Sequence, residues 1–417
     1  MESDKRRQHT GECPPVGETS TTSTVHDVPD HVLELILLRL DASACLVRAA
    51  SACKRWCRVV AGAGFLKRFR LLHVPVMGYY HNYSDLPVFQ VPASMSLDFL
   101  PEIDGTWMVI DSRNGILLVQ NRHKTIKSYD VDPDLAVCEP LTWQYKTIRM
   151  PEPLRRPHDD ASRSLGLFLS SGGMRRGEAA GRRGGHHSSN ANNISLSNFK
   201  IIDVLLTGHM AFRSRVVPAA SVYRSSHGGW RLVTCGWKKG SNATVLSRDD
   251  DCFAFAGRAN GSLYWTSIQG LGRALVVEEA TARVSLEHLP VSIERWSEAS
   301  AFRVLGSECG STLRAVCLVG DYLSFYARRR GGEWVFQTNA NLRLPQDIRG
   351  ALWLPEILAA HETCVLVASQ GCTRLLEVDL KTMAVERVRK RVDNEWPVYA
   401  YEMPWPPTLK AQAPLRV

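Results

Sequence analysis

The most concentrated pattern of apolar positions in the chain lies between Val28 and Trp56. Apolar side chains recur there at steps of three and four residues, which places them on one face of a helix. The residues on that face are Leu33, Ile36, Leu37 and Leu40. Val32, Leu35 and Leu38 widen the apolar arc beyond a single stripe. We therefore expect a helix that meets apolar neighbours on two sides.

Local signals predict where the helices of this segment begin and end. Pro29 suits the first turn of a helix, where its missing N–H would have no partner, and Asp27 before it is a candidate cap. Polar residues at Asp41 and Ser43 separate this helix from a second helical stretch that ends in Cys53-Lys54-Arg55-Trp56. Three short helices in about fifty residues form a small core, so we expect this unit to need a partner or a neighbouring domain.

From about residue 95 the pattern changes to short β-branched and aromatic runs that are separated by turn residues. Residues 107–111 and 116–120 form a predicted hairpin around Asn114-Gly115, a pair suited to positive φ. We place a third strand at 128–131 and a last short strand from Val137 towards residues 139–142. Together these strands predict one four-stranded meander.

Parts of this meander recur further along the chain. Asn260-Gly261 matches Asn114-Gly115, and the acids Asp132, Glu278 and Asp379 mark corresponding positions. The gaps between these acids are roughly three and two periods of about fifty residues, the spacing of propeller blades. We therefore expect about six four-stranded blades over residues 96–407, with five or seven blades as alternatives. The alternating segment 398–403 is expected to pair into the first blade and close the ring.

The fold class that follows is α+β and multidomain: a small three-helix unit followed by an all-β propeller. We assign residues 27–64 to the helical unit, 65–95 to a linker helix or strap, and 96–407 to the propeller. Residues 1–26 and 170–195 are rich in small, polar and charged residues, so we expect a disordered N-terminal tail and a disordered insertion. Residues 408–417 form a short C-terminal tail.

Composition narrows the possible classes of protein. The 417 residues are 44% hydrophobic and 22% charged, which is typical of a folded soluble protein. We find no apolar run of about 18 residues and no secretory signal, so we expect a cytoplasmic or nuclear protein without a membrane span. The net charge of +9 is concentrated in arginine runs without interleaved aromatics. We therefore expect solvated loops rather than a nucleic-acid site.

Candidate chemistry is sparse. The eleven cysteines are scattered without a Cys-x-x-Cys pair, and we interpret them as reduced, mostly buried thiols rather than as zinc ligands. The pair His186-His187 and the acidic run 249–251 are interpreted as parts of solvated loops. No nucleophile, phosphate-loop or metalloprotease motif occurs, so we predict a non-catalytic protein without a cofactor or metal.

The helical segment resembles the F-box family. The residues that carry this resemblance are Val28, Pro29, Leu33, Ile36, Leu37, Leu40, Leu46, Cys53 and Trp56, with Lys54 completing the Cys-Lys-x-Trp motif. Val28 stands where the family usually has Leu, and Ala52 where it often has Val. The resemblance implies that these nine residues bind the Skp adaptor of a cullin–RING ubiquitin ligase. The docking free energy is then expected to come from the leucine face, with Leu37 and Leu40 as its test positions.

The downstream segment resembles the β-propeller domains that follow the F-box in large plant families, especially in grasses. The wording Asp111-Ser112-Arg113-Asn114-Gly115 and Val137-Cys138-Glu139-Pro140-Leu141-Thr142 carries this second resemblance. It implies a substrate receptor of an SCF-type ligase that contacts cullin through the Skp adaptor and binds a target through propeller loops. Two alternatives stay open: a propeller scaffold without ubiquitin transfer, and a propeller enzyme fused to an adaptor-binding module.

Overall fold

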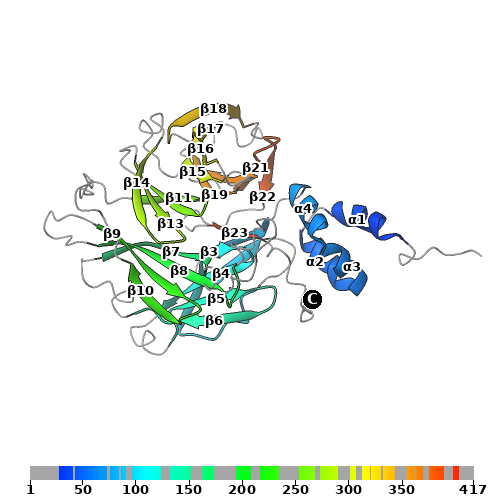
Figure 1. The fold of residues 1–417 in the computed structure, drawn as a ribbon, viewed down its shortest axis with the longest axis horizontal. Helices are drawn as coiled ribbons and strands as arrows, with labels where there is room; N and C mark the ends of the chain where they lie inside the picture. Colours follow the sequence, from blue (N-terminus) through cyan, green and yellow to red (C-terminus); the bar gives the residue numbers. More distant parts are fainter. Residues whose placement is uncertain are drawn as a thin grey trace, which may run out of the picture.

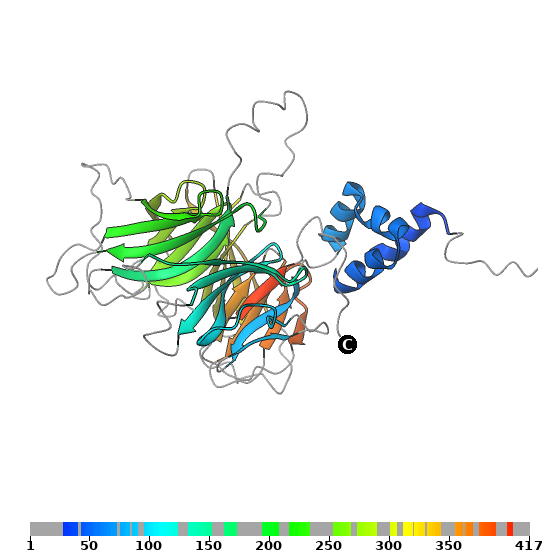
Figure 2. The ribbon, with the colours of Figure 1, turned by 90° about the horizontal axis from the view of Figure 1, so that it is seen from below.

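The protein consists of four helices beside a ring of β-sheets (Figures 1 and 2). The structure is a computed structural model. It describes residues 28–40, 43–72, 76–83, 86–90, 96–123, 132–151, 162–172, 194–207, 217–233, 253–267, 273–289, 301–306, 312–319, 321–329, 332–342, 355–361, 363–369, 375–388 and 398–402. The tail 1–26, most of the Arg-rich insertion, the third strand expected at 128–131, His186-His187 and the acidic run 249–251 lie outside these residues.

The helices are α1 (Asp30–Leu38), α2 (Ser43–Ala52), α3 (Lys54–Val60) and α4 (Ala63–Leu72). Pro29 occupies the N-cap of α1, and its carbonyl accepts the N–H groups of Val32 and Leu33 at 3.0 Å. No side chain caps α1, and Asp27, the expected cap, lies outside the described residues. The Cys53 thiol caps α3 by accepting the Trp56 N–H at 3.5 Å.

Five blades of four antiparallel strands follow one another in the chain. Blade 1 is β3 (Gly105–Arg113), β4 (Ile116–His123), β5 (Leu135–Glu139) and β6 (Gln144–Ile148). Blade 2 is β7 (Ser162–Ser171), β8 (Phe199–Thr207), β9 (Val217–Arg224) and β10 (Gly229–Val233). Blade 3 is β11 (Phe253–Ala259), β12 (Ser262–Ser267), β13 (Arg273–Glu278) and β14 (Val284–His288). Blade 4 is β15 (Phe302–Leu305), β16 (Arg314–Val319), β17 (Tyr322–Arg328) and β18 (Trp334–Asn341). Blade 5 is β19 (Pro355–Ala360), β20 (Cys364–Ser369), β21 (Leu375–Asp379) and β22 (Val385–Val388).

A sixth sheet has three strands and joins the two ends of the propeller. Its order is β2 (Leu86–Gln90), β1 (Val76–Tyr83) and β23 (Val398–Glu402). The prediction of about six four-stranded blades is therefore wrong, because the structure has five such blades and this closing sheet. The segment 65–95, expected as a linker, supplies β1 and β2, and β23 pairs with β1 instead of entering blade 1. A repeat search misses this sheet because its strands come from opposite ends of the chain.

The hydrophobic core is divided into layers between neighbouring sheets. One cluster lies between each successive pair of blades from blade 1 to blade 5, and another joins blade 5 to the closing sheet. The last cluster joins the closing sheet and blade 1 to the helices. This arrangement explains why β4 begins with the continuous apolar run ILLV: Ile116 and Leu118 pack towards blade 2, and Leu117 and Val119 pack on the opposite face.

Inner strands carry a recurring β-bulge. The pairing register shifts at residues 109–111 of β3, 164–166 of β7, 255–257 of β11 and 357–359 of β19. Gly257 has φ +125°, and a Cβ there would lie 2.9 Å from the Val304 carbonyl oxygen of β15. A glycine is required at this position because the bulge brings the backbones of blades 3 and 4 together.

A turn between the third and fourth strands recurs in three blades and corrects the sequence register. Thr142 donates to Glu139 at 2.8 Å, Thr281 to Glu278 at 2.6 Å and Thr382 to Asp379 at 2.9 Å. The next residue has φ 57° in each blade: Trp143, Ala282 and Met383. Glu139, rather than Asp132, is thus the counterpart of Glu278 and Asp379. Residues 135–139, expected to form the last strand of the meander, are the third strand of blade 1.

Two further expectations concern the bounds of the insertion and the membrane. The insertion was expected from residue 170, but Ser170 and Ser171 belong to β7, and Ile194 is buried against blade 1. Among the described helices, none combines the length and the hydropathy that crossing a membrane requires.

Candidate functional site

Helix α1 has a buried side and an apolar side that faces solvent. Leu33 and Leu37 are each 1% exposed and pack in the core that the helices share with the propeller. Leu35 and Ile36, between them in sequence, are 54% and 49% exposed. The apolar arc of α1 therefore covers the chain's own core with one side and presents large aliphatic side chains on the other.

The nine residues predicted to bind the adaptor are divided by this geometry. Leu33, Leu37 and Leu46 are buried, Val28, Leu40, Cys53 and Trp56 are half-buried, and Pro29 and Ile36 are exposed. Three leucines assigned to docking are thus part of the chain's own core. Leu35 is exposed beside Ile36 but was absent from the predicted set. Its position outside the stripe of buried leucines was the sequence signal for it.

Two ion pairs hold α1 against the later helices. Arg55 of α3 donates to the Asp30 carboxylate at 2.8 Å and to the Val28 carbonyl. Arg68 of α4 pairs with Glu34 of α1. Both pairs are partly exposed, so their contribution to stability is small. Their geometric effect is to fix which side of α1 faces outwards.

The helices and the propeller share one hydrophobic cluster. It contains Leu46 of α2 and Phe65 and Phe69 of α4, together with Tyr80 of β1 and Tyr401 of β23. Helix α2 lies against β1, and the Tyr80 and Tyr401 rings meet edge to face at 5.8 Å between their centroids. The orientation of α1 relative to the propeller is thus fixed by packing.

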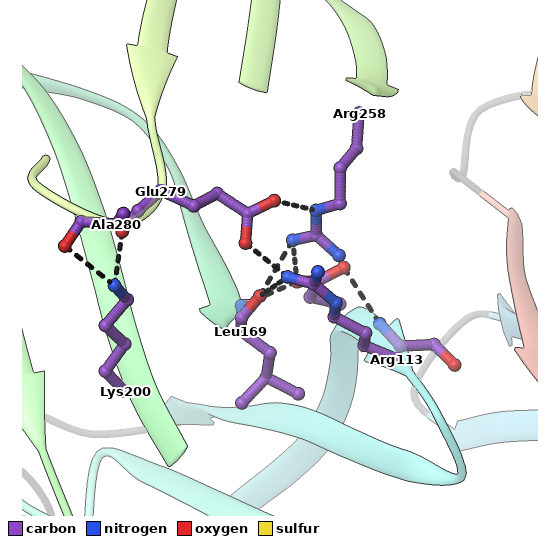
Figure 3. A network of polar contacts seen from close by, with 8 residues as sticks. Arg113, Leu169, Lys200, Arg258, Glu279 and Ala280 are labelled. Carbon is purple, nitrogen blue, oxygen red and sulfur yellow. Dashed lines mark hydrogen bonds and ion pairs between the residues drawn. The ribbon is translucent and has the colours of Figure 1, made fainter. Parts of the chain in front are cut away.

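A second polar site joins blades 1, 2 and 3 (Figure 3). Arg258 of β11 donates to Asp111 of β3 at 2.9 Å and to the Leu169 carbonyl of β7 at 2.9 Å, and its Nε lies 3.3 Å from the Glu279 carboxylate. Arg113 of β3 also pairs with Glu279. The Leu169 N–H donates to Asp111 at 2.6 Å. Each carboxylate in this network therefore has a guanidinium partner.

Protonation within this network is set by competing effects. Burial raises the pKa of Glu279, but Arg258 and Arg113 outweigh it, so that pKa lies below its ordinary value. Burial lowers the pKa of Lys200 on β8 to about 8, with Arg224 acting in the same direction and Glu279 opposing it. The Lys200 ammonium donates to the carbonyls of Glu279 and Ala280. The network is suited to locking three blades together, since its charges are already paired.

The remaining candidate chemistry is inert. Burial raises the pKa of the Cys317 thiol to about 12, and it also raises the pKa values of Cys138 and Cys364, so these thiols are protonated. The described cysteines are free, and Cys45 is exposed rather than buried. The described residues contain no group of three or more His, Cys, Asp or Glu side chains arranged to hold a metal ion.

Comparison with protein families identifies the helical unit. Residues 25–68 match the F-box domain. The chain therefore carries an F-box domain followed by a β-propeller. A search among curated proteins finds no match.

Comparison with solved structures finds distant propellers. The six-bladed lectin of Aleuria aurantia is 12% identical over 74% of this chain and 86% of that chain, with a TM-score of 0.33. AztD from Citrobacter koseri is 11% identical over 78% and 84%, with a TM-score of 0.31. The propeller domain of Cps50 (Swd1) from Myceliophteria thermophila is 9% identical over 71% and 88%, with a TM-score of 0.32. At these values no functional argument rests on the likeness.

Proposed function

We propose that this chain is a target-binding subunit of an SCF-type cullin–RING ubiquitin ligase. The F-box binds the Skp adaptor, which links the chain to cullin, and the propeller binds the target. The protein itself is non-catalytic, because its role in such a complex is to hold a target near the transferring enzyme. The wording around Asp111 and Val137 favours the plant F-box families, and the expected compartment is the cytoplasm, the nucleus or both.

The observation that carries this proposal is the exposed aliphatic pair on α1. Leu35 and Ile36 lie within the F-box domain on the side of α1 that is turned away from the shared core. Burying one aliphatic side chain contributes about 1.5–3 kcal/mol, and these two are about half-exposed. Their burial against an adaptor would add a few kcal/mol to docking.

The test separates docking from folding. Leu35→Ala with Ile36→Ala should weaken binding of the purified Skp adaptor on the order of a hundredfold while the melting temperature stays unchanged. The matched control is Leu232→Ala on β10, which is also an exposed leucine and should leave adaptor binding intact. Isothermal titration and thermal melting provide the two measurements. Undiminished binding by the folded double variant would contradict the proposal.

The original test positions serve a different purpose. Leu37→Ala with Leu40→Ala alters one buried and one half-buried residue of the shared core, so we expect a lower melting temperature from it. A pull-down of the intact chain then tests ubiquitin-ligase assembly. A complex that contains the Skp adaptor but never cullin would favour the scaffold alternative.

A further inference from the structure

The outer strand of blade 4 presents an unusual sheet edge. β18 is the last strand of its sheet and pairs with β17 on one side, and no described strand pairs with its other side. It lies at the rim of the molecule in Figure 1. Six of its eight residues fall in the pattern of an exposed or nearly exposed strand, including Phe336, which is 52% exposed. About half of its backbone N–H and C=O groups point away from β17 and are available to a further strand.

The other outer strands carry features that discourage strand addition. β2 contains Pro87, β6 Lys146, β10 Gly229 and Arg231, β14 Glu287, and β22 Glu386 and Arg387. Each of them is four or five residues long. β18, with the sequence WVFQTNAN, has eight residues and no charge, proline or glycine. Proteins normally protect a sheet edge with short strands, charges or proline, and β18 has none of these protections.

Exposed apolar side chains lie at both ends of this edge. The Phe336 ring contacts Tyr326 of β17 edge to face at 5.6 Å and still presents half of its surface to solvent. At the other end, Tyr322 pairs with Asn341 in register and is 49% exposed. Backbone groups along the edge can bind an extended chain, and these aromatic side chains can contact its alternate residues.

We propose that the free edge of β18 binds an extended, uncharged segment of the target protein by adding it to blade 4 as a further strand. This inference rests on the proposed function of the chain as a target-binding subunit. The segment is uncharged because β18 offers no charged side chain to pair with one. A second copy of the chain is the less suitable occupant. Two paired strands of this length bury on the order of 300 Å² per partner, below the roughly 800 Å² of a stable interface.

The test uses phage-displayed random peptides of about ten residues, long enough to pair with this strand, selected on the full-length chain. The selected peptides should bind in fluorescence anisotropy and slow hydrogen exchange of the β18 amides. N-methylation of one alternating set of peptide residues should abolish binding, while N-methylation of the other set should leave it unchanged, because only one set faces β18.

Variants of the edge provide the second arm. Phe336→Ala should weaken peptide binding about tenfold, and Gln337→Lys with Asn339→Lys should abolish it, with unchanged melting temperatures. The matched control is Gln144→Lys, an exposed residue on the outer strand β6, which should bind peptide normally.

Several outcomes would overturn the inference: no enriched peptide, protection outside β18, equal tolerance of both N-methylated series, or insensitivity to the edge variants. A concentration-dependent dimer that the double lysine variant dissociates would assign the edge to a second copy. Adaptor binding is measured on the same preparations and depends on α1. Loss of the peptide result with adaptor binding intact therefore refutes only this inference, whereas failure of adaptor docking refutes the proposed function.

Discussion

At the scale of single residues, Asp203 shows how burial controls a charge inside a blade. Its side chain lies within β8 and is almost completely buried, and its only printed side-chain partner is the Ser164 hydroxyl, which donates at 2.6 Å. Burial raises the pKa of Asp203 to about 6, and the Ser164 hydrogen bond only partly opposes this. The ionised carboxylate is thus the costly form in the folded protein.

This shift predicts a pH dependence with a definite sign. The folded-state pKa exceeds the unfolded value of 3.8, so the folded protein holds the proton more tightly and stability falls as the pH rises from about 4 to 6. Asp203→Asn should raise the free energy of unfolding by about 1–2 kcal/mol at pH 7.5 and by much less at pH 4. Urea denaturation at both pH values measures the difference. The exposed Asp98→Asn control should show no such pH dependence, and an equal effect of Asp203→Asn at both pH values would contradict the assignment.

At the scale of elements, the recurring acid–threonine turn determines where the third strand of a blade ends. In blade 5, Thr382 donates to Asp379 at 2.9 Å and accepts the Ala384 N–H at 3.2 Å. In blade 3, Thr281 donates to Glu278 and accepts the Arg283 N–H at 3.1 Å. The two hydroxyls perform the same local task, since each satisfies a side-chain acceptor and a backbone donor.

Equivalent contacts predict equivalent energetic effects. Thr382→Val and Thr281→Val should each lower the free energy of unfolding by about 1–2 kcal/mol, because each removes two hydrogen bonds and keeps the side-chain shape. Chemical denaturation gives the values, with Thr147→Val at an exposed site on β6 as control. Effects that differ widely between blades 3 and 5 would show that the turns are similar in geometry but not in energy.

At the scale of the whole molecule, the shared cluster makes the F-box and the propeller one cooperative unit. Tyr401 of β23 is fully buried in this cluster, and its hydroxyl donates to the Gly115 carbonyl of blade 1 at 3.0 Å. The same strand pairs with β1, against which α2 packs. A perturbation at the ring closure therefore reaches the helices through direct contacts.

Tyr401→Phe tests this cooperativity. Loss of its buried hydrogen bond should destabilise the protein by about 1–2 kcal/mol and shift one calorimetric transition in which the helices and the propeller unfold together. Tyr145→Phe, at an exposed tyrosine on β6, is the matched control. Two separate transitions, of which the variant moves only one, would show that the helices and the propeller unfold independently.

The sequence by itself determined the features that depend on neighbouring residues. The spacing of Leu33 and Leu37 and the Cys-Lys-x-Trp motif identified the F-box, because helical periodicity and capping act within one or two turns. Asn114-Gly115 and Asn260-Gly261 were predicted as hairpin turns, and all four residues have positive φ. These backbone preferences are local, so they can be read without the fold.

The tertiary structure alone decided which of these residues meet. The sequence did not show which side of α1 is buried, since apolar residues cover both sides, and it assigned to docking three leucines that belong to the core. The pairing of β1 with β23 and the contacts of Arg258 with two other blades join segments far apart in the chain. Such contacts depend on how the sheets pack around the ring, and no local spacing encodes that packing.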